Sequence, residues 1–490
     1  MSKILPIHKG DSVFEMSNYR PISLLPIFSK ILEKLMYSRV IDFIKKFKIL
    51  YANQYGFQKG LSTELAINSL LNNIIDCLEN KEVGFCILLD FAKAFDTVNH
   101  EILLEKLYYY GIRGVAHKWF KSYLSERMQC TEIGNTRSKF DFVKSGVPQG
   151  SVLGPLLFLL YINDIVLSSN LCKFTLFADD TSLFYSHKSK KEGTNILNSE
   201  LDKIADWLAA NKLSLNVSKS KLLIFNNNKG TLVNDSADSV DDSFGIYING
   251  EKLKEVDHAK YLGALIDDKL NWSYHIKSVN LKLSKGIGLL AKIRHYVPSS
   301  TLKSLYYSFL NPYIDYNLLN WGMAATTNLN SVNLKIKKAI RIISFKERDF
   351  HTDPLFKDLE ILPLEKSIEF KYAKFMWRLA NKLLPENLSA NFRMNERNMI
   401  PNSISRLESL KRFIRFSGPE LWNELPHCIT NKPTLNSFSN NLKKYFIHGT
   451  VHNSINTRGN NSNSGNNGNH ASRLTNNTGL NRPFASRWNQ

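Results

Sequence analysis

Cysteine is scarce in this chain of 490 residues, and long hydrophobic segments are missing altogether. None of the five cysteines is paired with another at metal-ligand spacing, which excludes a zinc knuckle and favours buried thiols in a reducing compartment. The longest apolar run, at residues 152–165, is too short and too interrupted by glycine and proline to cross a bilayer. Because the N-terminus lacks a signal-peptide pattern, we expect a soluble intracellular protein, in the nucleus, the cytoplasm or both, with no membrane partner.

Acidic residues are few relative to basic ones. The chain has 64 lysines and arginines against 44 aspartates and glutamates, a formal net charge of +20 at pH 7. This surplus is spread along the chain, which favours a polyanionic partner such as nucleic acid over the alternative, a basic protein tuned only for solubility. A hydrophobic content of 43% suffices for packed cores, and the length predicts two or three structural units.

Two adjacent carboxylates, Asp179 and Asp180, stand at the centre of the apolar segment 176–184. The flanks predict two short strands, and residues 178–181 predict the turn of a hairpin between them. At a turn both carboxylates can face the same space, where they repel each other unless a cation lies between them. A metal site is one interpretation. A solvated turn is the other, and it is favoured while the pair is considered alone.

A third carboxylate reverses this preference. Residues 83–89 predict a continuous apolar strand buried on both faces, and Asp90 ends it. A carboxylate in that position is costly unless it is paired or binds a metal. The helices and loop between Asp90 and Asp179 allow the two strands to be sheet neighbours. Three acids without a nearby histidine or cysteine suit two Mg²⁺ ions that activate a 3′-hydroxyl and hold a triphosphate.

Helical patterns surround these acids. Residues 29–47 and 64–79 carry apolar side chains at helical spacing, and the tight loop 146–151 opens onto a very apolar helix with Ser151 as its N-cap. From residue 273 onward the pattern is helical. Its first helix has an apolar stripe with basic residues along the flanks, namely Lys277, Lys282, Lys285, Lys292 and Arg294.

Seven short motifs also occur in the order in which they stand in reverse transcriptases, which leaves little room for chance. They are Asn-Tyr-Arg-Pro-Ile-Ser (18–23), Gln-Tyr-Gly-Phe-Gln-Lys-Gly (54–60), Leu-Asp-Phe-Ala-Lys-Ala-Phe-Asp (89–96), Gly-Val-Pro-Gln-Gly-Ser-Val-Leu-Gly-Pro (146–155), Phe-Ala-Asp-Asp (177–180), Leu-Asn-Val-Ser-Lys-Ser-Lys (215–221) and Tyr-Leu-Gly (261–263). The chain thus resembles the reverse transcriptases of non-LTR retrotransposons of the jockey type, and we expect it to be N-terminally truncated relative to their full polyprotein.

The resemblance implies an α+β fold of the right-hand polymerase kind, with fingers, an antiparallel palm sheet, a helical thumb and a helical C-terminal extension. The expected domains are fingers and palm at 1–270, thumb-like helices at 271–350, the C-terminal helical extension at 351–450 and a disordered Asn/Ser/Gly-rich tail at 451–490. The motifs are specific up to about residue 270 and less so beyond it.

The resemblance also implies roles for single residues. Asp90, Asp179 and Asp180 correspond to the catalytic acids, which hold two Mg²⁺ ions, with Mn²⁺ as a possible substitute. Lys219 corresponds to a lysine proposed to protonate pyrophosphate, and Lys221 is a nearby competitor. A salt bridge is the simpler role for either lysine.

Further residues correspond to the nucleotide and primer sites. The nucleotide set is Arg20 at the triphosphate, Phe91 through its backbone carbonyl, Phe95 under the sugar, and Gln149 with Gly150 beside the nascent base pair. The simpler alternatives are a solvated arginine for Arg20, core packing for Phe95, and a helix-entry turn for Gln149 and Gly150. The segment Tyr261, Leu262 and Gly263 resembles the primer grip, and Asp96 is expected to be structural.

The implied partners are an RNA template, a DNA primer or target, and dNTPs; the oligomeric state is not predicted. Two alternatives remain. The first is a catalytically inactive relic of a retroelement that only binds nucleic acid. The second is a group II intron maturase, which ranks last because no splicing domain is evident.

Overall fold

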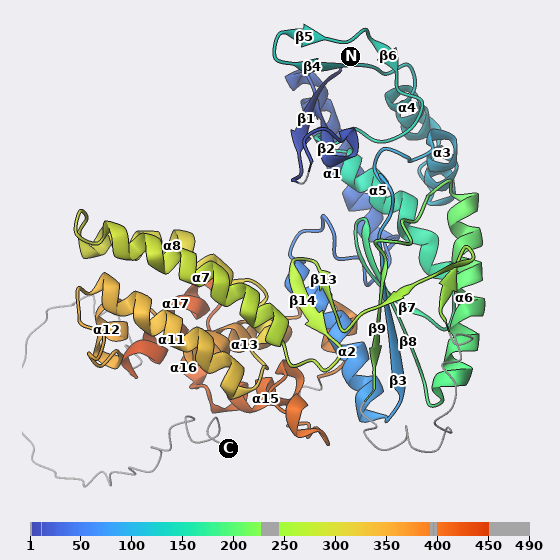
Figure 1. Cartoon of the computed structure of the whole chain (residues 1–490). Helices are drawn as coiled ribbons and strands as arrows, with labels where there is room; N and C mark the ends of the chain where they lie inside the picture. Colours follow the sequence, from blue (N-terminus) through green and yellow to red (C-terminus); the bar gives the residue numbers. More distant parts are fainter. Residues whose placement is uncertain (1, 11, 227–244, 393–394, 396–398, 450–490) are drawn as a thin grey trace, which may run out of the picture.

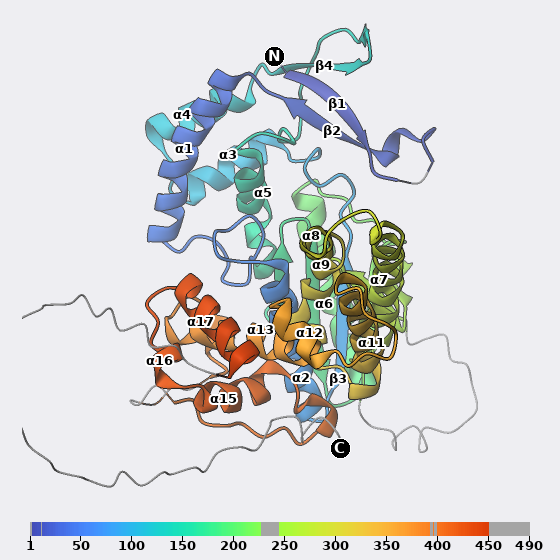
Figure 2. The ribbon, with the colours of Figure 1, turned by 90° about the vertical axis from the view of Figure 1, so that its left-hand side faces the viewer.

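The computed structural model describes residues 2–10, 12–226, 245–392, 395 and 399–449. An N-terminal lobe stands above a central sheet, and a helical lobe lies to the side of the sheet (Figures 1 and 2). The tail predicted to be disordered, 451–490, lies outside the described residues. Within them, no helix is both long enough and apolar enough to cross a membrane.

The central sheet has five strands in the order β12-β9-β3-β8-β7. Its middle strand pairs antiparallel with both neighbours, and only the short edge strand β12 runs parallel to the strand beside it. The antiparallel sheet expected from the resemblance is therefore confirmed. The strands are β3 (Val83–Leu89), β7 (Lys173–Phe177), β8 (Asp180–His187), β9 (Lys221–Phe225) and β12 (Lys254–Glu255).

Side chains of β3 enter two different cores. Phe85 and Ile87 pack with α5 (Gly154–Ile162) and α6 (Lys190–Ala210) on one face. Cys86 and Leu88 pack on the other face, with α2 and the helical lobe. Because successive side chains of a strand point to opposite faces, the apolar run is buried on both sides, as predicted.

The N-terminal lobe combines a small sheet with three helices. Its strand β1 pairs antiparallel with β2 and parallel with β4. The elements of this lobe are β1 (Ser2–His8), β2 (Tyr19–Leu24), β4 (Met128–Ile133), β5 (Thr136–Arg137), β6 (Asp141–Phe142), α1 (Ile27–Lys46), α3 (His100–Tyr109) and α4 (Gly114–Leu124). The helix α2 (Thr63–Glu79) leads from this lobe to the central sheet.

The apolar side of α1 is covered only in its second half. Val40 and Ile44 are buried, whereas Ile31, Leu32 and Leu35 are exposed. The periodic pattern identified the apolar side correctly, but periodicity alone does not show what covers that side.

The helical lobe begins after the hairpin of β13 (His258–Tyr261) and β14 (Ala264–Asp267). Its helices up to residue 343 are α7 (Ser273–Ile293), α8 (Ser299–Phe309), α9 (Asn311–Asp315), α10 (Leu318–Trp321) and α11 (Thr326–Ile343). The predicted stripe of α7 is buried at Ile276, Val279, Leu283, Ile287 and Leu290, and its lysines are exposed.

The C-terminal helices pack against both α11 and the helix α2 of the central unit (Figure 2). Arg415 forms an ion pair with Asp76 of α2, and the Ser405 hydroxyl donates a hydrogen bond to Glu79. These helices therefore fix the helical lobe to the back of the sheet. They are α12 (Asp353–Asp358), α13 (Leu364–Ala380), α14 (Glu386–Ser389), α15 (Ile414–Glu424), α16 (His427–Thr430) and α17 (Leu435–His448).

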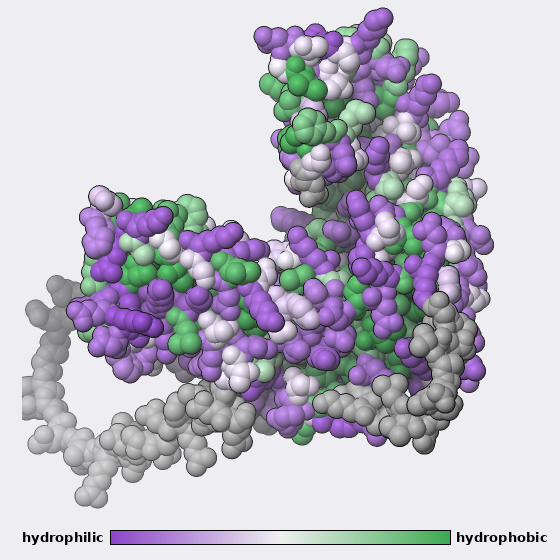
Figure 3. Space-filling view, in the orientation of Figure 1, coloured by the Kyte–Doolittle hydropathy of each residue, from purple (hydrophilic) through white to green (hydrophobic). Residues whose placement is uncertain are grey.

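A wide hollow separates the N-terminal lobe from the helical lobe (Figure 3). The central sheet forms its closed side, and the hairpin β13–β14 lies between that sheet and α7 (Figure 1). The molecule is thus an α+β right-hand polymerase fold, with the sheet as palm and a helical lobe in the place of the thumb.

Candidate active site

The turn between β7 and β8 carries two of the three predicted acids. Phe177 pairs with Asp180, so Ala178 and Asp179 form a two-residue loop. Ala178 has a φ of +57°, a left-handed conformation that such tight hairpin loops use and that a Cβ atom disfavours. The predicted hairpin is confirmed, with Asp180 as the first residue of β8.

Asp90 lies beside Asp180. Leu89, the last residue of β3, pairs with Thr181. One step further along β3 is Asp90, and one step back along β8 is Asp180. Because neighbouring strands are about 5 Å apart, the ends of these strands bring the two carboxylates together.

The backbone around Asp90 is held by the segment that precedes β9. The Asp90 carbonyl accepts a hydrogen bond of 2.8 Å from the Asn216 amide, and the Asp90 amide donates one of 3.1 Å to the Ser220 hydroxyl. Phe91 bridges to Leu215, but its own carbonyl accepts no hydrogen bond from the described residues. That carbonyl is therefore available to a ligand.

The pKa values of the two acids at the turn are raised above the usual value for aspartate. The pKa of Asp180 is raised to about 6, mainly because the surrounding protein displaces water and further because Asp179 and Asp90 repel its negative charge. The pKa of Asp179 is also raised, again by burial first and by repulsion from Asp90. The positive charges of Arg20 and Lys9 offset part of that rise. Arg20 and Lys9 thus balance only part of the negative charge at Asp179.

The donor chemistry of the three acids fits Mg²⁺, which prefers carboxylate oxygens together with phosphate and water. The carboxylates of Asp90 and Asp180 accept no hydrogen bond from the described residues, so their oxygen atoms are available. Yet no group of three or more Asp, Glu, His or Cys side chains in the described part of the chain is close enough to enclose a metal ion. The acids therefore suit a metal but do not form a closed cage around one.

Phe95 lies on a platform of aromatic rings. Its ring stacks on Phe158 of α5, with 4.5 Å between the ring centroids, and meets the edge of Phe57 at 6.4 Å. Its carbonyl accepts a hydrogen bond of 2.8 Å from the amide of Val147. Phe95 is only half-buried, so one side of the ring can meet a ligand.

Gln149 and Gly150 connect the central unit to the N-terminal lobe. The Ser23 amide donates a hydrogen bond of 2.6 Å to the Gln149 carbonyl. Gly150 has a φ of +107°, and a Cβ atom there would lie 2.9 Å from the Ser23 carbonyl oxygen. Glycine is required here because the loop runs against strand β2, which is a contact that the sequence did not predict.

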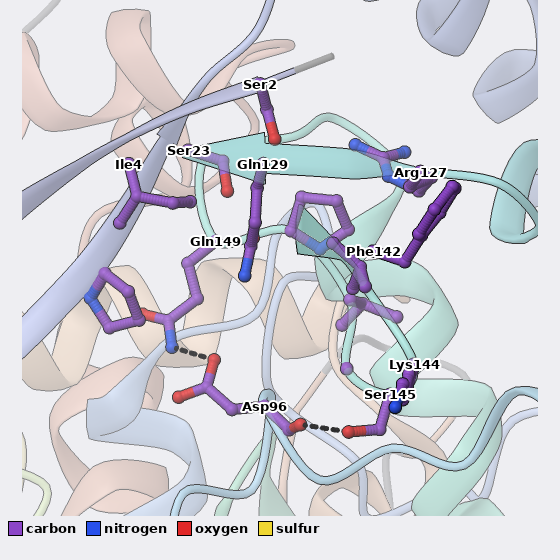
Figure 4. Close-up of a pocket in the computed structure, with 15 residues that line it drawn as sticks. Ser2, Ile4, Ser23, Asp96, Arg127, Gln129, Phe142, Lys144, Ser145 and Gln149 are labelled. Carbon is purple, nitrogen blue, oxygen red and sulfur yellow. Dashed lines mark hydrogen bonds between the residues drawn. The ribbon is translucent and has the colours of Figure 1, made fainter. Parts of the chain in front are cut away.

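The Gln149 side chain is engaged by Asp96. Its amide donates a hydrogen bond of 2.9 Å to the Asp96 carboxylate at the wall of a cavity of about 280 Å³ (Figure 4). Burial raises the pKa of Asp96, and this hydrogen bond opposes the rise. The Ser145 hydroxyl donates to the Asp96 carbonyl, also drawn in Figure 4. Asp96 thus holds the loop, in line with the structural role expected for it.

Glu33 of α1 is a residue that sequence reasoning missed. Its side chain is 1% exposed, and its carboxylate accepts hydrogen bonds from the Val152 amide at 2.6 Å and the Tyr123 hydroxyl at 3.0 Å. It supports the backbone that leads into α5, where Ser151 was the predicted cap. Ser151 does accept from the Gly154 amide at 2.9 Å, so the helix entry has two supports.

The two candidate lysines differ in their surroundings. The Lys221 amine donates a hydrogen bond of 2.9 Å to the Ser218 carbonyl. The Lys219 amine is exposed and has no partner among the described residues, and Lys219 is the immediate neighbour of Ser220, which binds Asp90. Of the two, Lys219 is the one free to meet a ligand.

The segment that resembles a primer grip is a tight turn between β13 and β14. Tyr261 is buried, and its hydroxyl lies 3.5 Å from the Thr175 carbonyl of β7. Leu262 and Gly263 form the turn, and the Leu262 carbonyl accepts a hydrogen bond of 2.5 Å from Tyr316. Only the turn, and not the tyrosine ring, can face a bound primer.

Two further residues belong with the acids, although the sequence analysis assigned a role to neither of them. Lys9 acts on Asp179 together with Arg20, across from the turn. Gln54 is fully buried, and its side-chain oxygen accepts a hydrogen bond of 3.1 Å from the Ala178 amide. The motif containing Gln54 was a sequence signal without an assigned role. The structure therefore gathers the acids, Arg20 and Lys9 in one region, and gives Gln149 a partner in Asp96.

Comparison with protein families gives a match over residues 7–266 to the family described as reverse transcriptase (RNA-dependent DNA polymerase). The chain is 29% identical over 409 residues to a probable RNA-directed DNA polymerase from transposon BS of Drosophila melanogaster, covering 79% of this chain and 43% of that protein. It is 28% identical over 398 residues to the RNA-directed DNA polymerase from mobile element jockey of the same species, covering 77% and 41%. The chain thus spans about two fifths of the length of these relatives.

Among solved structures, a telomerase from Candida tropicalis in complex with a fragment of telomeric RNA is similar with a TM-score of 0.41 and 11% identity, over 80% of this chain and 58% of that one. The apo telomerase of the same species gives a TM-score of 0.39 and 11% identity, over 75% and 65%.

Proposed function

Because this chain belongs to the reverse transcriptase (RNA-dependent DNA polymerase) family, we propose that it extends a DNA primer with dNTPs by copying an RNA template. The proposal rests mainly on one observation. Asp90, at the end of β3, lies close to Asp179 and Asp180, at the β7–β8 turn. Their mutual repulsion contributes to raising the pKa of Asp180 to about 6. A pair of divalent cations would relieve that repulsion.

Asp90, Asp179 and Asp180 would hold two Mg²⁺ ions, with the Phe91 carbonyl as a further ligand and Mn²⁺ as a substitute. Bound there, the ions would lower the pKa of the primer 3′-hydroxyl and balance charge on the leaving pyrophosphate. The protein's part is to keep the three carboxylates at the strand ends. The hydrogen bonds of Asp90 with Asn216 and Ser220 support that role.

The incoming nucleotide would lie between the acids and the N-terminal lobe. Arg20 and Lys9 already balance negative charge at Asp179, which suits them to a triphosphate. Lys219 would give a proton to the pyrophosphate, because its amine is free and next to the segment that holds Asp90. Phe95, fixed by Phe158 beneath it, would meet the sugar where a 2′-hydroxyl would project.

The template and primer would lie in the hollow between the two lobes. The net charge of +20 and the exposed lysines of α7 favour a polyanion there. The turn at Leu262 and Gly263 would contact the primer strand. Gln149 and Gly150 would border the nascent base pair, held in place by Asp96 and Ser23.

Primer extension on poly(rA)/oligo(dT) with Mg²⁺ tests the proposal. Asp179→Asn is expected to abolish extension and to leave template binding nearly unchanged, because the substitution removes a charge but hardly any volume. Asp202→Asn is the matched control, since Asp202 is an exposed acid on α6. Its extension rate should equal that of the wild type.

The second candidate function is binding of nucleic acid without catalysis. The three acids are all present, which favours an active enzyme, but the basic surface alone would serve binding. A wild-type chain that binds template and incorporates no nucleotide with Mg²⁺ or Mn²⁺ would support this second function and exclude the first.

A further inference from the structure

Residues 53–60 form a short connection, here called the strap, which lies along the free edge of β7. The Leu176 amide donates a hydrogen bond of 2.9 Å to the Asn53 carbonyl, and the Tyr55 amide donates one of 2.7 Å to the Leu176 carbonyl. Gln54 and Leu176 thereby form a parallel bridge. Because β7 is the last strand of the sheet, the strap covers backbone groups that would otherwise be unpaired.

The strap contacts the catalytic turn directly through Gln54. The side-chain oxygen of Gln54 accepts two hydrogen bonds, from the Gly56 amide at 2.9 Å and from the Ala178 amide at 3.1 Å. Gln54 is 0% exposed, so no water competes for this oxygen. One buried acceptor thus ties the strap to the residue with left-handed backbone immediately before Asp179.

Gly56 makes the approach possible. A Cβ atom at this position would lie 2.5 Å from the Ala178 nitrogen and 3.0 Å from the Phe177 carbonyl carbon. Any side chain there would push the strap and the turn apart. The two segments are therefore in backbone contact, and a shift of one must move the other.

The C-terminal helices hold the strap from the other side. The Asn387 side chain, on α14, donates hydrogen bonds of 2.6 Å to the Tyr55 hydroxyl and 3.0 Å to the Ser69 hydroxyl of α2. Tyr55 itself is 1% exposed. Arg378, on α13, donates a hydrogen bond of 2.5 Å to the Gly60 carbonyl at the far end of the strap.

We propose that the strap and the helices α13 and α14 form a brace that holds the Ala178–Asp179 turn in its left-handed conformation. Gln54 is then a positioning residue for the catalytic acids, and Asn387 acts on the same turn through Tyr55. The C-terminal helices gain a role in catalysis without touching substrate. This inference rests on the proposed polymerase function, but its structural part can be measured without activity.

The first experiment uses Gln54→Met in the full chain, because methionine has a similar shape and no carbonyl oxygen. Hydrogen exchange at the Ala178 amide should become at least roughly 10-fold faster, since its acceptor is removed. In primer extension kcat should fall roughly 10- to 100-fold, while the KM for dNTP and the Kd for poly(rA)/oligo(dT) stay within about 2-fold. Lys59→Met is the control on the same strap, because it introduces the same side chain at an exposed position.

The second experiment uses Tyr55→Phe and Asn387→Leu, alone and combined. Each single variant should speed exchange at the Ala178 amide and lower kcat, and the double variant should be no worse than the stronger single one. Asn441→Leu on α17 is the control, because its amide donates a hydrogen bond to the Ser437 carbonyl of its own helix. Control variants should behave as the wild type.

The outcomes separate the brace from the function. Unchanged exchange at Ala178 in Gln54→Met would overturn the brace whatever the activity. A general loss, in which melting temperature and template binding fall together with kcat, would make Gln54 an ordinary core residue and also overturn it. If the wild type incorporates nothing while exchange responds as expected, the proposed polymerase function fails and the brace stands as a structural contact.

Discussion

A buried histidine offers a stability test at the level of a single residue. His275 of α7 is 6% exposed, accepts a hydrogen bond of 3.3 Å from the Leu265 amide, and has no partner for Nε2 in the described part of the chain. Burial, with a smaller contribution from Lys282, lowers its pKa from 6.5 to about 4. The folded protein therefore holds this imidazole neutral across most of the acidic range.

The unfolded chain takes up a proton at His275 near pH 6.5, whereas the folded chain does so only near pH 4. The contribution of His275 is thus fully present above pH 6.5 and declines as the pH falls toward 4, by about 3 kcal/mol. Urea unfolding of wild type and His275→Gln between about pH 7 and 4 measures it. The wild type should lose more stability than the variant. An exposed control, His351→Gln, should follow the wild type, and parallel curves for all three would refute the expectation.

Sugar selection is a second residue-level test. If Phe95 meets the sugar, Phe95→Ala opens space for a 2′-hydroxyl, and the preference for dNTP over the matching ribonucleotide in kcat/KM should fall roughly 10- to 100-fold, or about 1.4–2.7 kcal/mol. Phe95→Tyr keeps the ring and should keep the preference. Equal selectivity in Phe95→Ala and the wild type would remove Phe95 from the nucleotide site.

At this scale, the sequence predicts a site residue well only when its role is evident from neighbouring positions in the chain. Asp179 and Asp180 are adjacent, and Asp90 ends an unmistakable strand, so their residue types and positions pointed to one site. Gln54 and Glu33 could not be found in this way. Their partners lie 124 and 119 residues away, and a buried polar side chain in a loop or helix leaves no local pattern.

At the scale of elements, the carboxylate of Glu33 connects α1 to the backbone at the start of α5. Glu33 accepts hydrogen bonds from the amides that lead into α5 and from Tyr123. Glu33→Met would leave these buried donors unpaired, and the free energy of unfolding should fall by about 2 kcal/mol. Urea or thermal unfolding measures the loss. Lys34→Met, the next and exposed position of α1, should stay within about 0.5 kcal/mol of the wild type, and similar losses in the two variants would contradict the role of Glu33.

Elements with one strong pattern could be predicted well. The apolar run of β3 indicated burial on both faces, and the stripe of α7 faces its core as expected. The first half of α1 shows the limit, because Ile31, Leu32 and Leu35 belong to the same stripe as Val40 and remain exposed. The local sequence determines which side of a helix is apolar. The segments that pack against that side come from distant parts of the chain.

At the scale of the whole molecule, the hollow between the lobes predicts where nucleic acid binds. Lys285 and Lys292 are exposed on α7, which flanks the hollow (Figure 1). Changing both to Gln should weaken duplex binding and reduce the slope of log K against log salt concentration by about 1 for each phosphate that α7 no longer neutralises. Binding of poly(rA)/oligo(dT) across a salt series measures this. The control is Lys188→Gln with Lys190→Gln, in the connection before α6 and at its first residue, on the other side of the sheet. An equal change of slope would exclude a specific role for α7.

The arrangement of the lobes around the sheet could be predicted only from the order of the seven motifs in the sequence. Composition and periodicity indicated helices, strands and a nucleic-acid partner. The positions of the lobes depend on neighbouring segments such as Gly150 and Ser23, whose close approach no periodic pattern encodes. The packing of the C-terminal helices against α2 was likewise not predicted.

The hydrogen bond between Asn387 and Tyr55 also sets an order in time. Tyr55 and Asn387 are 332 positions apart in the sequence. At ribosomal speeds of roughly 5–20 residues per second, Tyr55 is therefore synthesised about 17–66 s before Asn387. During synthesis the β7–β8 turn can form long before the brace that holds it is complete. The nascent chain would then carry all three acids on a turn without its brace, and a ribosome that stops before residue 387 would release a protein in which the acids are present and their turn is unsupported.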